Sequence, residues 1–84
     1  MKYHDLKIER RWLERIHDGS KTSELRVNDR DFQVGDIIQF TVDGDIYSER
    51  EYKVTHVLTS DVCQGLELGY CILSVVEVLK EPIT

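Results

Sequence analysis

One short helical pattern followed by strand-like segments at hairpin spacing is the feature that most limits how this chain can fold. Residues 9–18 place Trp12, Leu13 and Ile16 on one helical face, and Gly19 follows as a helix stop. The segments that read as strands are residues 3–8, 22–27, 37–42, 46–58 and 70–79. This order predicts an α+β, mostly β fold, built as a small and mostly antiparallel β-barrel.

The strand after the helix is expected to be half buried. Its residues alternate in character, with Leu25 and Val27 on one face and Glu24 and Arg26 on the other. Because apolar side chains of a half-buried strand face the core, we expect Leu25 and Val27 to point inward. Glu24 and Arg26 would then project side by side on the opposite face.

Two connections carry expectations of their own. The pair Asp43-Gly44 predicts a hairpin turn between the two strands that flank it. The loop at residues 60–69 contains Leu66 and Leu68, and we expect both side chains to be tucked underneath it.

Length and composition predict one globular domain over residues 1–84. The chain is 40% hydrophobic and 32% charged, with five Gly and one Pro, which is the composition of a folded domain. No window is apolar enough for a membrane span, and the N-terminus lacks the apolar stretch of a signal peptide. We therefore expect a cytoplasmic protein with no membrane partner, and a monomer.

Neither the cysteines nor the histidines predict a metal site or a cofactor. Cys63 and Cys71 are too few for a disulfide scaffold or a four-ligand metal site, and we expect two ordinary thiols. The three histidines are scattered along the chain without ligand spacing.

Charge is distributed unevenly along the chain. The net charge is −5, which opposes tight, non-specific binding to a polyanion. Residues 1–30 hold eight Lys/Arg against six Asp/Glu, whereas residues 31–84 hold three against ten. Any anion site is therefore expected in the first thirty residues, although the same charges could form a solvated helix face.

Residues 19–31 carry the strongest functional signal. Lys21 follows the helix stop and offers a mobile positive charge for a phosphate or a polarised carbonyl. Arg26 offers a planar guanidinium for a phosphate or a base edge. Glu24 could orient Arg26, accept a hydrogen bond from an exocyclic amine or act as a general base. Asn28 and Arg30 extend the donors along the adjoining loop. Lys21, Glu24, Arg26, Asn28 and Arg30 are thus the predicted ligand-binding residues.

Plainer interpretations exist for the same residues. Glu24 and Arg26 could pair with cross-strand neighbours, which is worth about 0.2–1 kcal/mol when the pair is exposed. Asp29 and Asp31 could be turn formers whose side chains bond to local amides.

Aromatic residues and Asp36 also have plain interpretations. Trp12 is expected in the core, and Tyr47 and Tyr52 are expected to cover the barrel seam, although any of these rings could stack on a base. Asp36 after Gly35 is expected to cap a turn.

The pattern Gly-x-Lys-x-x-Glu-x-Arg at residues 19–26 resembles the signature of the ASCH domains, a branch of the PUA-like group of small β-barrels. The run through Val34-Gly35-Asp36 is similar to one family of short bacterial and phage proteins of unassigned function. The resemblance implies a PUA-like barrel with the helix packed against one opening. It also implies an RNA- or nucleotide-related role, without naming a substrate.

Some ASCH relatives are amidohydrolases that remove an acyl group from modified cytidine with a Lys, a Thr and a Glu. Lys21 matches the Lys of that set, but Glu24 occupies the Thr position, and residues 60–69 are too few for the helical insertion that carries the acid. That activity is therefore not transferred to this chain. A divergent hydrolase with Glu24 as general base and Lys21 as electrophile stays open.

Three hypotheses follow from the sequence. The first is a module that binds single-stranded RNA, a modified base or a nucleotide, with weak and salt-sensitive affinity that is micromolar or poorer. The second is the divergent nucleoside-modifying hydrolase. The third is an accessory protein that contacts a basic partner through the acidic residues Asp43, Asp45, Glu49 and Glu51.

Overall fold

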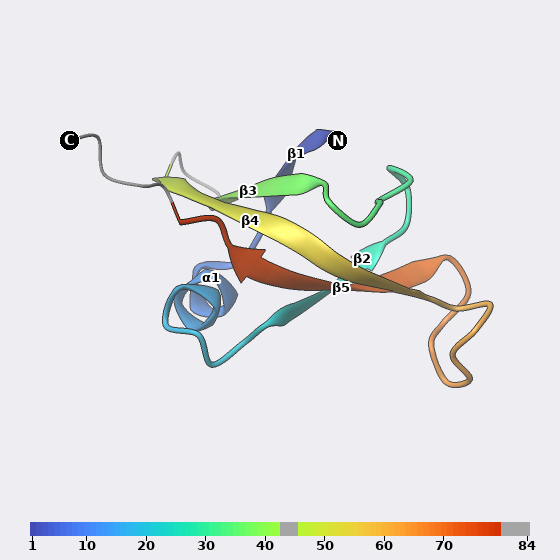
Figure 1. The fold of residues 1–84 in the computed structure, drawn as a ribbon. Helices are drawn as coiled ribbons and strands as arrows, with labels where there is room; N and C mark the ends of the chain where they lie inside the picture. The colour runs from blue at the N-terminus through green and yellow to red at the C-terminus, as the bar shows by residue number, and fades with distance from the viewer. Residues whose placement is uncertain (43–45, 80–84) are drawn as a thin grey trace.

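The computed structural model describes residues 1–42 and 46–79 (Figure 1). Its elements are β1 (Tyr3–Lys7), α1 (Arg10–His17), β2 (Ser23–Val27), β3 (Ile37–Val42), β4 (Ile46–Thr59) and β5 (Tyr70–Glu77). The elements expected from the sequence are therefore present, with bounds that differ by one or two residues. The expected turn at Asp43-Gly44 lies outside the described residues.

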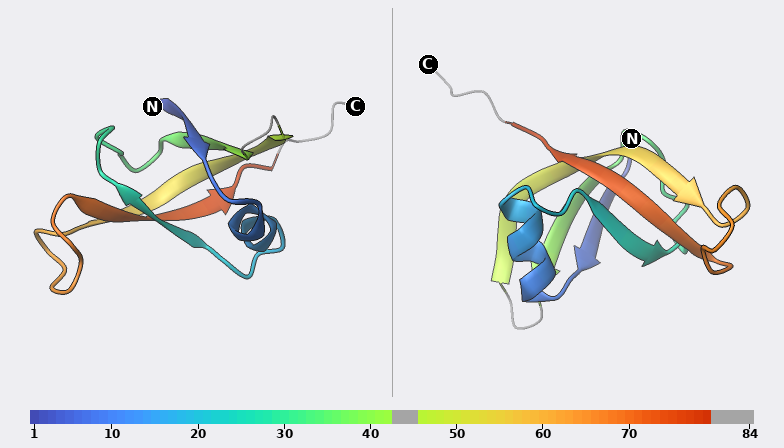
Figure 2. Two further views of the ribbon diagram at one scale, coloured as in Figure 1. Left: turned by 180° about the vertical axis from the view of Figure 1, so that it is seen from behind. Right: turned by 90° about the horizontal axis from the view of Figure 1, so that it is seen from below.

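The five strands form one sheet in the order β1-β3-β4-β5-β2. β1 pairs with β3 in parallel, and the other three pairings are antiparallel. The sheet is strongly curled into a half-barrel, with α1 beside it (Figures 1 and 2). The predicted α+β, mostly β class is confirmed at this level, and β1 and β2 are the two edges of the sheet.

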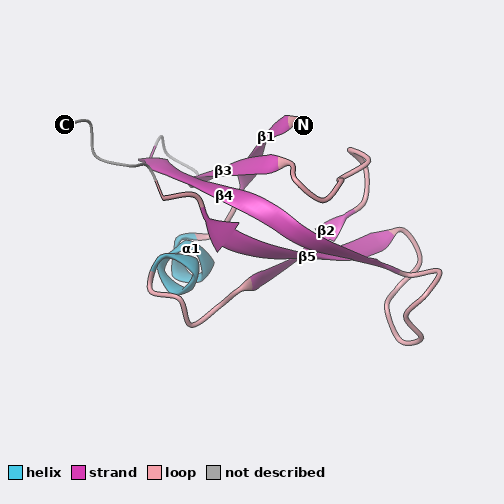
Figure 3. Ribbon diagram, viewed as in Figure 1, coloured by secondary structure: helices cyan, strands magenta, loops and turns pink. Residues whose placement is uncertain are grey.

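Helix α1 (Figure 3) ends where the sequence predicts. Gly19 has a φ of +84°, a left-handed conformation that a glycine adopts without a Cβ penalty, and its amide donates to the Ile16 carbonyl over 3.2 Å. Arg15 and His17 in the last turn suit the negative end of the helix dipole. Leu13 and Ile16 are buried, so packing against the sheet stabilises this short helix.

The core fills the concave side of the sheet. Its fully buried side chains include Leu6, Ile38, Phe40, Val54, Cys71 and Leu73, contributed by β1, β3, β4 and β5. Both cysteines are free, as predicted, and burial raises the pKa of the Cys71 thiol.

The expected orientation of β2 is wrong. Glu24 is only 8% exposed, whereas Leu25 and Val27 are 55% and 50% exposed. β2 is an edge strand, and its inner face lies against a cleft with charged side chains beside α1 and the end of β1 rather than against the apolar core. On the outer face, Leu25 and Val27 stand opposite Ile72 and Tyr70 of β5, so apolar cross-strand pairs form there instead.

The expected burial of Leu68 is also wrong. Leu68 is 89% exposed, and Leu66 is half buried. The loop at residues 60–69 projects beyond the end of the sheet away from α1 (Figure 1) and is closed by its own turn hydrogen bonds, such as that from the Leu66 amide to the Cys63 carbonyl. Because the loop extends past the sheet, little apolar surface is available beneath its tip.

Asp36 has a larger role than the expected turn cap. It is 2% exposed and accepts from His4 Nε2 at 2.8 Å, the Gln33 amide at 3.0 Å and the Lys2 amide at 3.1 Å. Burial by itself raises the pKa of Asp36, but these hydrogen bonds lower it to about 2. The Phe32 ring contacts the His4 ring edge-on, with 4.7 Å between the ring centres. The cluster of His4 and Asp36 thus joins β1 to the start of β3.

Candidate functional site

Lys21 and Glu24 meet on the inner face of β2. Lys21 Nζ lies 3.0 Å from Glu24 Oε1 and also donates to the Ser23 carbonyl. The Glu24 side chain is 10% exposed and that of Lys21 is 23% exposed. The turn at Gly19 returns the chain from α1 to β2, which places Lys21 at the rim and Glu24 deeper inside.

Arg26 joins the same group from two positions further along β2. Its Nη1 donates to the Lys7 carbonyl at 2.8 Å and lies 3.8 Å from Glu24 Oε2. Lys7 ends β1, so this hydrogen bond connects the two edges of the curled sheet. Arg26 therefore closes the half-barrel and borders the site at the same time.

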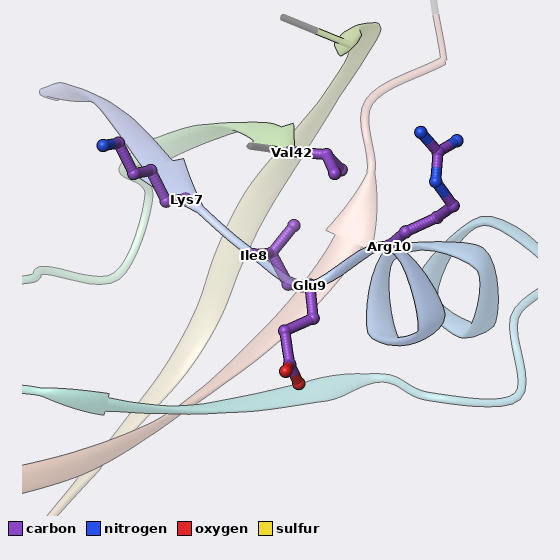
Figure 4. A pocket seen from close by; sticks show the side chains of 5 residues that line it. All are labelled: Lys7, Ile8, Glu9, Arg10 and Val42. Atoms are coloured by element: carbon purple, nitrogen blue, oxygen red, sulfur yellow. The ribbon is translucent and has the colours of Figure 1, made fainter. Parts of the chain in front are cut away.

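A cleft of about 460 Å³ opens where these side chains meet. Its lining residues are Lys7, Ile8, Glu9, Trp12, Lys21, Glu24, Leu25 and Arg26. A second hollow of about 380 Å³ shares Lys7, Ile8 and Glu9 with it and adds Arg10 and Val42. Figure 4 shows the second hollow, with the Glu9 side chain extending toward β2 and that of Arg10 extending away from it.

Asn28 and Arg30 do not join this cleft. The Asn28 side chain is exposed, and its backbone amide donates to the Gly69 carbonyl at 2.8 Å. Arg30 Nη1 donates to the Asp5 carbonyl at 3.0 Å, and Arg30 lines a separate hollow with Tyr70 and residues of β2. Of the five predicted ligand-binding residues, the structure thus brings together Lys21, Glu24 and Arg26.

Five residues of the cleft lining are not among the predicted ligand-binding residues: Lys7, Ile8, Glu9, Trp12 and Leu25. Lys7 and Glu9 flank the β1–α1 connection, and no spacing signal in the sequence links them to β2. Trp12 packs against the core, as expected, and also forms part of the cleft wall. The Arg11 and Arg15 guanidinium groups lie 4.5 Å and 5.9 Å from the centre of its ring, so Trp12 contributes an apolar wall that already contacts two cations.

The cleft is slightly cationic although the chain is acidic. Lys7, Lys21 and Arg26 outnumber Glu9 and Glu24 by one, against a net charge of −5 for the whole chain. The position of this excess agrees with the expectation that an anion site would fall in the first thirty residues.

Other sequence candidates are placed by the structure. Tyr52 is 3% exposed and its ring lies 6.3 Å from that of His17, so Tyr52 is a packing residue rather than a surface for stacking a base. The side chain of Tyr47 lies outside the described part of the chain.

Among the described residues, no group of three or more His, Cys, Asp or Glu is arranged to hold a metal ion. None of the helices in those residues has the length and apolar character needed to cross a membrane.

These features define a class of protein: a small, β-rich domain whose curled sheet and single described helix border a cleft of mixed charged and apolar lining. Residues 3–75 match the family described as a domain of unknown function (DUF3850), and the chain belongs to that family. Its fold is similar to the crystal structure of hypothetical protein PH0355, with a TM-score of 0.65, 19% identity, and coverage of 93% of this chain and 100% of that chain. At this identity the likeness concerns the fold alone. No curated protein matches the chain significantly.

Proposed function

We propose that this domain binds single-stranded RNA or a nucleotide in the cleft bordered by Lys21, Glu24 and Arg26. The observation that supports it best is the convergence of these three side chains, from a short stretch of sequence, on one concave site beside Trp12. The cleft volume of about 460 Å³ falls within the roughly 300–1,000 Å³ that small-ligand sites occupy.

The electrostatics of the cleft suit a nucleotide better than a duplex. Lys7 and Lys21 offer positive charge to a phosphate, while the carboxylate of Glu24 suits the donor edge of a base. A duplex backbone requires an extended basic surface, whereas the cationic excess here is one charge within an acidic chain. We therefore expect weak, salt-sensitive binding of one or a few nucleotides.

The finer assignment to the ASCH branch of the PUA-like group is part of this proposal. Its support is the pattern at Gly19, Lys21, Glu24 and Arg26, of which the last three border the cleft after the turn at Gly19. An ASCH kinship would supply a reason for these residue types at this spacing.

An amide NMR titration at low salt tests the proposal. Short single-stranded RNAs and then nucleotides are added, and we expect shifts clustered on Lys7, Trp12 and residues 21–26. Lys21→Ala should weaken binding at least fivefold because it removes a cleft cation, whereas Lys53→Ala, at an exposed lysine on β4, should not. Unchanged affinity in both Lys21→Ala and Arg26→Ala would show that the site is misplaced, and silent spectra would contradict nucleotide binding.

The hydrolase hypothesis uses the same two residues in other roles. Lys21 Nζ already donates to Glu24 Oε1 and to the Ser23 carbonyl, so its ammonium would have to leave these partners to polarise a substrate carbonyl. This pairing counts against Lys21 as the electrophile. Turnover of acylated nucleosides that disappears in Glu24→Gln would support the hydrolase instead.

The accessory-protein hypothesis stays a prediction. Asp43 and Asp45, on which it depends, lie outside the described residues. Capture of a basic partner that survives Lys21→Ala but fails after neutralising Asp43, Asp45, Glu49 and Glu51 would favour it over nucleotide binding.

A further inference from the structure

One oxygen of the Glu24 carboxylate is left without a donor. Oε1 accepts from Lys21 Nζ at 3.0 Å. The cation recorded near Oε2 is Arg26 Nη1 at 3.8 Å, which is too far for a hydrogen bond. Nη1 instead donates to the Lys7 carbonyl at 2.8 Å. Within the described residues, Oε2 thus lacks a hydrogen bond, although the side chain is nine-tenths buried.

Oε2 is not sealed from water, since Tyr52 Oη is the buried side-chain oxygen that lacks a partner among the described residues. A ligand that fills the cleft would displace this water, and an Oε2 covered without a donor would then be costly. Glu24 lines the 460 Å³ cleft, so this acceptor borders space that a ligand can enter. The site is therefore arranged to receive a donor from outside the protein.

We infer that the ligand presents an uncharged N–H group of a nucleobase to Glu24 Oε2. This step rests on the proposed function and names the edge of the ligand that the site recognises. A phosphate oxygen is an acceptor and would be repelled by Oε2. A cationic amine would meet the positive charges of Lys7, Lys21 and Arg26. An uncharged N–H satisfies the acceptor without either penalty.

The same geometry orients the rest of the ligand. With the base edge at Glu24, deep in the cleft, the phosphate extends toward the exposed Lys7, which borders both hollows. Trp12 then lies along the apolar surface of the bound base. Selectivity comes from Glu24, and phosphate affinity comes from Lys7 and Lys21.

Matched ligand pairs test this inference in the wild-type protein. AMP is compared with purine riboside 5′-monophosphate, which lacks the 6-amino group. CMP is compared with its N4,N4-dimethyl analogue, and UMP with its 3-methyl analogue. For each base that binds, we expect loss of the N–H donor to weaken binding about tenfold or more, because the bound ligand then covers Oε2 without supplying a donor.

Substitution of Glu24 shows whether this residue is the one that reads the donor. In Glu24→Leu, the affinity ratio within a ligand pair should fall to about one, because the acceptor is gone. Glu14→Gln, at an exposed position on α1 outside the cleft, is the control and should keep the wild-type ratio. If Glu24→Leu does not fold, Glu24→Gln replaces it and should reduce the ratio at least threefold through loss of the charge.

The outcomes separate this inference from the proposed function. If no nucleotide binds, the proposed function fails and the inference fails with it. If both members of every pair bind equally, nucleotide binding stands and the N–H inference is overturned. A donor preference that persists in the Glu24 variants also overturns it, because another group then reads the base.

Discussion

Two buried carboxylates in this small domain differ in how completely they are hydrogen bonded. Asp36 is 2% exposed and accepts from His4, Gln33 and Lys2. Glu24 is 8% exposed, but among the described residues its hydrogen-bond donor is Lys21 alone, and the residue lines a cleft. The saturated carboxylate joins parts of the fold, whereas the unsaturated one has capacity left for a ligand.

This difference separates structure from function more clearly than residue type does. Both residues are acidic and both lie beside a basic side chain. Only the count of donors shows that the Asp36 carboxylate is occupied within the fold, while Glu24 Oε2 can still accept from water or a ligand. The contrast predicts large stability effects at Asp36 and large binding effects at Glu24.

Removal of the Asp36 carboxylate is expected to have the largest effect on stability. Asp36→Ala leaves His4 and two backbone amides without their acceptor, and we expect a loss of about 3 kcal/mol in the free energy of unfolding. Urea denaturation measures it, with Glu67→Ala in the exposed loop as control. A loss below about 1 kcal/mol would remove the contrast with Glu24.

Acid should weaken the same cluster. Hydrogen bonding lowers the pKa of Asp36 from 3.8 to about 2, so its contribution to stability is complete above pH 4 and is lost as pH falls toward 2. Unfolding curves between pH 5 and 2 measure this loss. Because asparagine does not titrate, the free energy of unfolding of Asp36→Asn should depend less steeply on pH in this window. A slope equal to that of the wild type would show that Asp36 is not the group responsible.

Glu24→Gln is expected to cost about 1 kcal/mol or less in the free energy of unfolding. Its partners Lys21 and Arg26 are 23% and 24% exposed at the side chain and can reach water when the negative charge is removed. Thermal denaturation measures the effect. A loss as large as that of Asp36→Ala would make Glu24 a structural residue and would weaken the proposed site.

The smallest effects are expected at the arginines that connect the sheet edges. Arg26→Lys and Arg30→Ala each remove a hydrogen bond to a β1 carbonyl, from Lys7 and Asp5 respectively, and should cost about 0.5–1 kcal/mol. Hydrogen exchange should show faster opening confined to β1. Equal acceleration throughout the sheet would indicate that neither arginine acts locally.

The sequence predicted the elements well and the faces of β2 poorly. Alternation along residues 22–27 correctly indicated a strand, and the grouping of Lys21, Glu24 and Arg26 is present in the structure. Alternation defines two faces but does not say which one is inside. Because β2 is an edge strand beside a cleft that holds other charged side chains, its charged face turns inward, and the usual rule for a half-buried strand gives the opposite answer.

The Asp36 cluster lay beyond sequence reasoning for a different cause. His4 and Asp36 are 32 positions apart and meet because β1 pairs with β3 in parallel, in the register Tyr3 to Ile37. Hairpin spacing indicates antiparallel neighbours and gives no signal for such a pairing. Lys7 was not predicted for the same reason. Its carbonyl accepts from Arg26 only because the two edges of the sheet approach each other in the fold.

The strand order also has a consequence for how the domain folds. β3, β4 and β5 follow one another in the chain and pair as neighbours, so they can nucleate with little loss of loop entropy. β1 and β2 must find partners much further along the chain, in β3 and β5. The cleft, built from the edges and α1, is therefore expected to assemble late and to open first. A ligand bound in the cleft would therefore slow the unfolding of the domain.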